Sequence, residues 1–263
     1  MNEYEPTSTD NKLQNPPILS INETKQYKCV GIDGTKGGWL AACLVNGIVN
    51  VKIYSTINEL CSENCDADSI IIDIPIGLPE NNIDIRPDKE LRKYLKGKTS
   101  SVFPTPCRQA VNINDKQKAK EKNINVLGKS LSEQSLAICG KIKETDDFLC
   151  NNTEWINRLV ESHPEFIFMI LNDGFPIIEN KKTKNGIDKR LSILRKYINN
   201  IDYIINEMSS QKGMKKRVDD IIDAASLAVI GKLGIINGFR TIPENPRKDN
   251  RSIKMQIVFA DIC

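Results

Sequence analysis

Four short stretches of the chain carry acidic residues in positions that would suit metal-dependent phosphodiester hydrolysis. They are V-G-I-D-G-T-K-G-G-W (30–39), I-I-I-D-I-P-I-G-L-P (70–79), E-S-H-P-E (161–165) and D-D-I-I-D-A (219–224). Asp33 and Asp73 each end an apolar run that is typical of a buried strand. A carboxylate in that position loses hydration free energy unless it is paired, ligated or open to water. Several such carboxylates in one chain indicate that they converge on divalent cations.

Each strand-end carboxylate also has a structural interpretation. The glycine-rich segment 34–38 after Asp33 would let a backbone approach phosphate. It would equally suit a plain turn that Asp33 caps. The proline- and glycine-containing loop 75–79 after Asp73 is typical of a site at the edge of an α/β sheet. A structural aspartate bonded to loop amides would fit there too.

The D-D-I-I-D-A stretch predicts a helix with carboxylates on one face. Asp223 follows Asp220 by three residues and Asp219 by four, and both spacings bring side chains together on a helix. Asp219 and Asp220 point about 100° apart, so they cannot share one direction. A bound cation would reverse the repulsion between the neighbouring carboxylates. The alternative is an acidic first turn that the helix dipole favours, with Asp219 as its cap.

Glu165 follows the last predicted strand of the sheet and lies beside His163, the only histidine of the chain. With Glu161 on its other side, His163 would suit acid–base catalysis. A lone histidine before a proline is more often a structural hydrogen-bonding residue. Both interpretations stay open at this point.

Basic residues gather in two segments, 86–108 and 181–190, which we expect to hold phosphates. Contacts of this kind position a nucleic acid without reading its sequence. The residues assigned to this role are Arg86, Arg92, Arg108, Lys181, Lys182 and Arg190. A lysine run is also typical of an ordinary solvated surface.

Length and composition are those of an ordinary globular chain. The 263 residues suffice for one large α/β domain, and the net charge of +3 argues neither for nor against nucleic-acid binding. The 8 cysteines form no C-x-x-C pair, which favours reduced thiols over a zinc site. The polar, acidic first residues are unlike a signal or transit peptide. No apolar run reaches the ~20 residues that cross a bilayer, so we expect a cytoplasmic protein without a membrane partner.

Periodicity predicts the elements that must position these side chains. Strands are predicted at 27–33, 39–45, 48–54, 69–74 and 156–160, with Asn46-Gly47 as a two-residue hairpin turn and a late edge strand at 255–260. Helices are predicted at 57–64, from 87 onward, and at 113–126, 131–149, 187–199, 199–209 and 216–233, the last ending near Gly234. Prolines exclude regular structure at 99–108.

The order of these elements is that of an RNase H-like fold. Such a fold has a mixed five-stranded sheet, a three-strand meander followed by parallel strands, flanked by helices. We expect residues 27–263 to form this single domain, and the polar, proline-containing residues 1–26 to form a flexible arm.

Taken together, the motifs resemble the predicted RNase H-like nucleases of domain-of-unknown-function family 429. The resemblance runs from about Val30 to the C-terminus. Beyond the acidic stretches and the basic segment at 181–190, it includes R-x-D-x-x-x-R (86–92), S-S-V-F-P-T-P-C-R (100–108), L-S-E-Q (131–134) and K-I-K-E-T-D (141–146).

By similarity to Holliday-junction resolvases of the same superfold, the resemblance implies a site that holds Mg²⁺ or Mn²⁺ and cleaves DNA or RNA. The implied metal ligands are Asp33, Asp73, Asp220 and Asp223, with Glu165 as an additional acid. Two cations about 4 Å apart would activate water and stabilise the leaving oxygen. Without metal, such clustered carboxylates repel one another, so at least one of them should have a raised pKa.

Two other functions stay open. A phosphotransferase of the actin-like and sugar-kinase superfold would also begin with an Asp-Gly strand and loop, but the sequence shows no second phosphate loop and no adenosine-binding segment. A non-catalytic nucleic-acid-binding module is the third hypothesis, although an acidic cleft without metal would repel phosphate.

Overall fold

The computed structural model describes residues 25–81, 86–210 and 217–262. The predicted flexible arm, residues 1–26, lies outside these ranges except for its last two residues. Of the helices in the described ranges, none has both the length and the apolar character needed to cross a membrane.

A five-stranded sheet forms the centre of the molecule, in the order β3-β2-β1-β4-β5. The first three strands pair antiparallel, and β4 and β5 continue the sheet in parallel. This is the meander followed by parallel strands that was predicted, and it is consistent with an RNase H-like fold. The strands are β1 (Lys28–Thr35), β2 (Gly38–Val45), β3 (Ile48–Tyr54), β4 (Ser69–Ile72) and β5 (Leu159–Glu161).

The turn between β2 and β3 is the predicted hairpin. Asn46 and Gly47 have φ values of 51° and 79°. A two-residue turn of this kind requires positive φ at both positions, and asparagine and glycine adopt it most easily.

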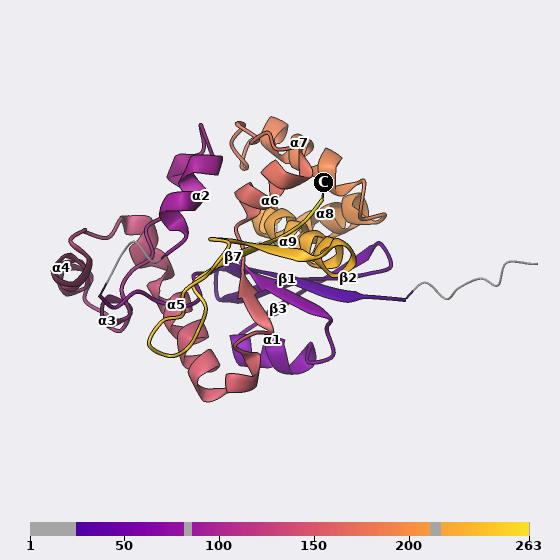
Figure 1. The fold of residues 1–263 in the computed structure, drawn as a ribbon. Coiled ribbons are helices and arrows are strands. Elements are labelled where there is room, and N and C mark those ends of the chain that lie inside the picture. The colour runs from indigo at the N-terminus through magenta and orange to yellow at the C-terminus, as the bar shows by residue number, and fades with distance from the viewer. Residues whose placement is uncertain (1–24, 82–85, 211–216, 263) are drawn as a thin grey trace, which may run out of the picture.

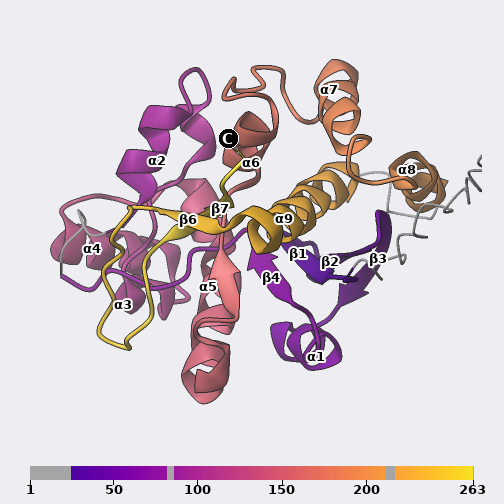
Figure 2. The ribbon, with the colours of Figure 1, turned by 45° about the vertical axis from the view of Figure 1, so that its right-hand side comes forward.

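Helices cover both faces of the sheet (Figures 1 and 2). On one face, α9 (Val218–Asn237) packs on β1, β2 and β4, with α6 (Pro164–Leu171), α7 (Lys184–Leu194) and α8 (Ile201–Ser210) around it. On the other face lie α1 (Ile57–Glu63) and α5 (Glu133–Asn151). A smaller group stands beside the sheet: α2 (Asp88–Tyr94), α3 (Arg108–Val111) and α4 (Lys116–Leu127). Short 3₁₀ turns at Thr99–Ser101 and Thr153–Trp155 complete the helical elements of the described residues.

Because Gly31 has no side chain, α9 packs directly against the backbone of β1. A Cβ atom at Gly31 would lie 1.9 Å from the Ala224 carbonyl oxygen and 2.5 Å from the Ala228 nitrogen. Only glycine permits this approach of helix to strand. Because α9 is covered by the sheet below and by helices around it, its middle, from Ile221 to Gly231, is buried throughout.

Three sequence predictions are corrected. The late strand, β7 (Ile257–Ala260), does not join the edge of the main sheet but pairs with β6 (Phe239–Ile242) in a separate two-stranded sheet. Helix α6 was not predicted. Helix α9 does not end at Gly234 but continues to Asn237. Gly234 instead leaves room for the Phe239 ring, which lies 2.1 Å from where a Cβ would be.

Candidate functional site

Asp33 and Asp73 lie at the carboxyl ends of neighbouring parallel strands. The Asp73 N–H donates to the Ile32 carbonyl oxygen at 2.9 Å, which continues the pairing of β1 with β4. Side chains alternate between the two faces of a sheet. Gly31 and Ile71 face α9, so the same alternation directs Asp33 and Asp73, two residues further on, to the α9 face.

Helix α9 brings two more carboxylates to this edge of the sheet. Asp223, one turn into the helix, is only 2% exposed. Asp220 accepts a hydrogen bond of 2.6 Å from the Thr35 hydroxyl at the end of β1. Three segments that are far apart in the sequence thus contribute to one acidic cluster, which we define as Asp33, Asp73, Asp220 and Asp223.

Lys181 supplies a positive charge inside this acidic cluster. Its Nζ donates to the Asp223 Oδ2 at 2.5 Å. Burial by itself would lower the pKa of Lys181, but attraction to Asp223, Asp33 and Asp73 raises it above the ordinary value. The segment between α6 and α7 therefore delivers a cation to the position where the sequence predicts a metal ion.

Burial raises the pKa of every carboxyl group in the acidic cluster. For Asp33, loss of hydration is joined by repulsion from Asp73 and Asp223, and its pKa lies well above the ordinary range. The same loss of hydration raises the pKa of Asp73 to about 6. Asp220 and Asp223 are shifted in the same direction, also mainly by burial. The sequence predicted a raised pKa for at least one of these groups from mutual repulsion; repulsion contributes at Asp33, but burial is the larger cause.

Glu165 lies next to the acidic cluster as a paired carboxylate. Its Oε2 accepts from the Arg190 guanidinium at 2.6 Å, and its Oε1 lies 3.6 Å from the Lys98 Nζ. Its negative charge adds to the burial that raises the pKa of Asp73 and of Asp223. Two basic partners thus offset the charge of Glu165 beside the cluster.

His163 makes one hydrogen bond through its ring. Its Nε2 lies 3.2 Å from the Ser101 carbonyl oxygen. Its Nδ1 is buried and has no hydrogen-bond partner among the described residues. The ring is also close enough to Asp73 to counteract the effect of burial on the pKa of that carboxyl group.

The donor set of the acidic cluster fits a hard divalent cation, because carboxylate oxygens are the ligands that Mg²⁺ and Mn²⁺ prefer. For Asp33, repulsion from Asp73, Asp223 and Asp220 adds to the effect of burial on its pKa, whereas Lys181 counteracts it. In their present rotamers, the His, Cys, Asp and Glu side chains of the described residues form no group of three or more arranged around one ion. Metal binding therefore requires these carboxylates to turn toward a common point and Lys181 to leave Asp223.

Two arginines assigned to phosphate contact are buried in ion pairs within the protein. Arg86, 4% exposed, donates to both carboxylate oxygens of Glu161, at 2.8 and 3.0 Å, and to Asp88 at 3.1 Å. Arg190, 1% exposed, donates to Glu165 and to the Gly186 carbonyl oxygen at 3.0 Å. Breaking such buried pairs is costly, so the assignment of both arginines to substrate is withdrawn.

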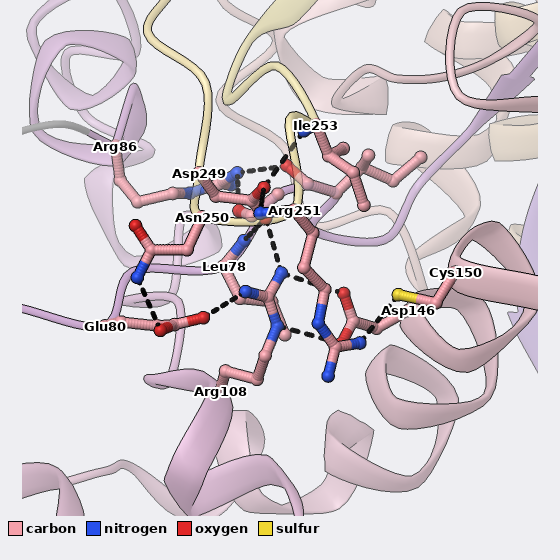
Figure 3. A network of polar contacts seen from close by, with 12 residues as sticks. Leu78, Glu80, Arg86, Arg108, Asp146, Cys150, Asp249, Asn250, Arg251 and Ile253 are labelled. Atoms are coloured by element: carbon pink, nitrogen blue, oxygen red, sulfur yellow. Dashed lines mark hydrogen bonds and ion pairs between the residues drawn. The ribbon is translucent and has the colours of Figure 1, made fainter. Parts of the chain in front are cut away.

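Arg108 is the centre of a buried ion-pair network that joins four segments (Figure 3). Its guanidinium makes two hydrogen bonds of 3.0 Å to Asp146 on α5 and also bonds to Glu80 and Asp249. Asp249 in turn accepts from the Leu78 backbone N–H at 3.1 Å. The prediction that Arg108 contacts phosphate is corrected in the same way: it fastens α3 to α5, to the loop after β4 and to the loop before β7.

Lys182 and Arg92 complete the basic residues that the sequence assigned to substrate. The Lys182 side chain is 77% exposed, and its Nζ lies 3.9 Å from Asp219 at the first turn of α9. Arg92 donates through Nε and Nη2 to the Val102 carbonyl oxygen, at 3.0 and 2.6 Å. Lys182 therefore keeps a solvent-exposed charge at the rim, whereas Arg92 holds the backbone of a neighbouring segment.

That neighbouring segment, residues 101–107, crosses the edge of the sheet, and we call it the strap. Its backbone is tied to several different elements. The bonds are His163 Nε2 with Ser101 O, Arg92 with Val102 O, Ser135 Oγ to Pro104 O at 3.1 Å, Thr105 N to Asp88 Oδ2 at 2.9 Å and Cys107 N to Asn123 Oδ1 at 2.8 Å. The strap is thus fixed in place without a ligand.

A cavity of about 300 Å³ lies between the strap, α5 and the sheet edge. Asp33 and Asp73 line it, so it adjoins the acidic cluster. Most of the remaining wall is apolar. The apolar lining includes Ile74, Pro75, Phe103, Pro104, Pro106 and Ile138.

We compared the chain with known protein families to see whether the residues of the site lie within one family match. Residues 31–248 match the family model described as Protein of unknown function (DUF429). The chain belongs to this family. Neither the curated proteins nor the solved structures gave a match. All four carboxylates of the acidic cluster, Glu165 and the strap lie within the DUF429 match.

Two residues of the DUF429 match that sequence reasoning passed over belong to the site. Thr35 fixes Asp220, and it stands two positions after Asp33 in the glycine-rich loop. Lys141 of α5 bonds to the Gly38 carbonyl oxygen and lies 4.1 Å from the centre of the Trp39 ring. Burial lowers the pKa of Lys141 even though Asp33 and Asp220 attract its charge. The signal for Lys141 was its place at the head of the K-I-K-E-T-D motif.

Proposed function

We propose that this DUF429 protein is a nuclease that hydrolyses phosphodiester bonds of DNA or RNA with the help of Mg²⁺ or Mn²⁺. One observation carries the proposal. Four carboxylates from β1, from the end of β4 and from α9 meet at one edge of the sheet, where burial raises the pKa of each and repulsion from Asp73 and Asp223 adds to the shift of Asp33. Such crowding is costly to the fold, and it suits a site that binds cations in the working protein.

Within the proposal, Asp33, Asp73, Asp220 and Asp223 hold the metal. When bound, the metal would activate a water and stabilise the leaving oxygen. The Thr35 hydroxyl keeps the Asp220 carboxylate turned toward β1. Glu165, paired with Arg190, borders the metal ligands and adds negative charge beside them.

Basic residues supply the phosphate contacts in this proposal. Lys182 is exposed at the rim, beside the first turn of α9. Lys181, once a metal ion replaces it at Asp223, has an ammonium group available for a phosphate oxygen. Both contacts position a substrate backbone without reading bases.

A cytoplasmic location is part of the proposal. The seven cysteines of the described residues are all free thiols. Free thiols are typical of a reducing compartment.

The test is a cleavage assay on single- and double-stranded DNA and RNA with Mg²⁺, with Mn²⁺ and with chelator. We expect metal-dependent cleavage that Asp73→Asn and Asp223→Asn each reduce at least 100-fold, because removing a ligand of a two-metal centre abolishes most of its catalysis. Asp202→Asn is the matched control, since Asp202 is exposed and pairs with Arg195, away from the acidic cluster. Melting curves would show that the variants fold. No cleavage of any of these substrates by the folded wild-type protein, or equal cleavage by the two site variants, would refute the proposal.

A further inference from the structure

The cavity beside the acidic cluster combines two kinds of surface. Its polar lining includes Asp33 and Asp73, together with Asp88, Glu161 and Lys141, and its apolar lining includes the Phe103 ring. Its volume of about 300 Å³ is at the lower end of small-molecule sites. A ligand that fills it therefore has a small, flat or compact apolar part and a second part that reaches the carboxylates.

The strap makes this cavity preformed. Its backbone is bonded on both sides of Phe103, through Val102 to Arg92 and through Pro104 to Ser135. A binding site that does not have to be ordered first loses less free energy on binding. Residues 101–106 of the strap line the cavity, and a volume of about 300 Å³ suits one base better than a stacked pair.

Two buried polar atoms on cavity-lining residues lack partners. Thr105 is 4% exposed, and its Oγ1 has no hydrogen-bond partner among the described residues. The Nδ1 atom of His163, another residue that lines the cavity, is also buried without a hydrogen-bond partner among the described residues. Buried polar atoms are normally paired. A hydroxyl and a ring nitrogen can each donate or accept, which matches the mixed donors and acceptors on the edge of a nucleobase.

We propose that the cavity binds the base of one unstacked nucleotide. The base stacks on Phe103 and bonds to Thr105 and His163, while its phosphate lies toward Asp33 and Asp73. The position of the phosphate rests on the proposed nuclease function, whereas binding of the base does not. The ligand is either a free nucleotide or an unpaired nucleotide of a strand, because both present the same base and phosphate.

Nucleosides test the cavity separately from the metal site, since they carry a base and no phosphate. We would titrate the common nucleosides into metal-free protein and follow binding by NMR or calorimetry. We expect saturable binding of at least one nucleoside. Phe103→Ala should weaken it roughly tenfold or more, as is typical of a lost base–aromatic contact. Phe175→Ala is the matched control, because Phe175 is 71% exposed and outside the cavity lining.

A second pair of variants separates binding from folding. Thr105→Val should weaken nucleoside binding severalfold without lowering the melting temperature, because the hydroxyl has no partner to lose. Thr145→Val is its control: Thr145 is also buried, with an unpartnered Oγ1, but it does not line the cavity. No saturable binding of any nucleoside at millimolar concentration would overturn the proposal. So would binding that neither Phe103→Ala nor Thr105→Val changes.

Competition then identifies the source of the nucleotide. We would compete a labelled nucleoside with nucleoside monophosphates, with a single-stranded oligonucleotide and with a blunt duplex, each with and without Mg²⁺, because salt screens buried carboxylates little. Displacement by monophosphates alone supports a free nucleotide, and displacement by the single strand supports an unpaired strand nucleotide. Displacement by the blunt duplex as well as by the single strand would contradict an unstacked base. If the wild-type protein binds nucleosides but cleaves no nucleic acid, the result contradicts the proposed nuclease function and not the binding of a base.

Discussion

The carboxylates of the acidic cluster repel one another, and the ammonium group of Lys181 neutralises part of their charge. Lys181 pairs with Asp223 and attracts Asp33 and Asp73 at longer range. Even so, burial keeps the pKa of Asp73 near 6. A carboxyl group that resists ionisation in the folded protein makes the folded state less stable at neutral pH than at mildly acidic pH.

The first prediction concerns Asp73→Asn in metal-free protein. The folded pKa of Asp73, about 6, lies above its ordinary value of 3.8. Between these values the folded state holds more protons than the unfolded state, so the free energy of unfolding falls as pH rises from about 4 to 6 and then stays low. Asp73→Asn removes this loss. We expect the substitution to stabilise the protein at pH 7.5, by on the order of 3 kcal/mol, and at pH 4.5 by a smaller amount, about 1 kcal/mol.

Urea unfolding at the two pH values measures this difference. Asp202→Asn should show the opposite sign, because hydrogen bonding to Arg195 lowers the pKa of Asp202. That pairing stabilises the folded state at pH 7.5 and is lost as the pH falls through the folded pKa. An equal effect of Asp73→Asn at pH 4.5 and pH 7.5 would show that its carboxyl group titrates normally.

At the scale of elements, close contact between α9 and β1 sets the position of Asp223 relative to Asp33. The contact depends on Gly31, where a Cβ would lie 1.9 Å from the Ala224 carbonyl oxygen. Neither a backbone oxygen nor the strand beneath it can give way cheaply. The geometry of the site is therefore encoded partly by a residue that carries no functional group.

The second prediction is that Gly31→Ala destabilises the protein and displaces Asp223. We expect a loss of about 3 kcal/mol or more in the free energy of unfolding, as for severe overpacking. Gly140→Ala on α5 is the control: nothing lies within 4 Å of its Cβ position, so alanine should stabilise the helix by roughly 0.5–1 kcal/mol. Chemical denaturation of both variants measures the effects. If Gly31→Ala were as stable as wild type, α9 would not rest on β1 as described.

The sequence predicted the elements whose signals are local. The Asn46-Gly47 hairpin and the strand-end carboxylates each follow from a few neighbouring residues. Helix α6 was not predicted because its eight residues, Pro-Glu-Phe-Ile-Phe-Met-Ile-Leu, are almost all apolar, and periodicity does not distinguish so short an apolar run from a strand. Strand β7 was expected on the main sheet because its partner, β6, gave no clear signal of its own.

The roles of the arginines could not be predicted, for a physical reason. Whether a guanidinium faces substrate or a buried carboxylate depends on partners that are remote in sequence. Arg86 lies 75 residues from Glu161, and Arg108 lies 141 residues from Asp249. Composition and spacing contain no information about such pairs. The carboxylates of the acidic cluster were easier, because the end of a buried strand already marks an unusual place for a charge.

At the scale of the whole molecule, a chain with a net charge of only +3 gathers four carboxyl groups at one edge of its central sheet. The four carboxylates come from both ends of the sequence, so they meet only in the folded chain. Any cation that binds them binds the folded state and not the unfolded one. Metal affinity and folding stability are then linked by mass action.

The third prediction follows from this linkage. Mg²⁺ at 10 mM should raise the melting temperature of the metal-free protein at pH 7.5. If Kd is about 1 mM, the free energy of unfolding increases by about 1.4 kcal/mol. The effect should shrink at pH 5.5, because Asp73, with its pKa of about 6, is then largely protonated and protons compete with metal.

Asp223→Asn should reduce the stabilisation by Mg²⁺. Lys181→Met should enlarge it, because the ammonium group that pairs with Asp223 no longer competes with the metal. Lys182→Met is the matched control, since Lys182 is exposed and lies 3.9 Å from Asp219. Scanning calorimetry in MgCl₂ and in NaCl of equal ionic strength measures these shifts. Equal shifts in the two salts, or a Lys181→Met response like that of Lys182→Met, would mean that Lys181 does not occupy the place of a metal ion.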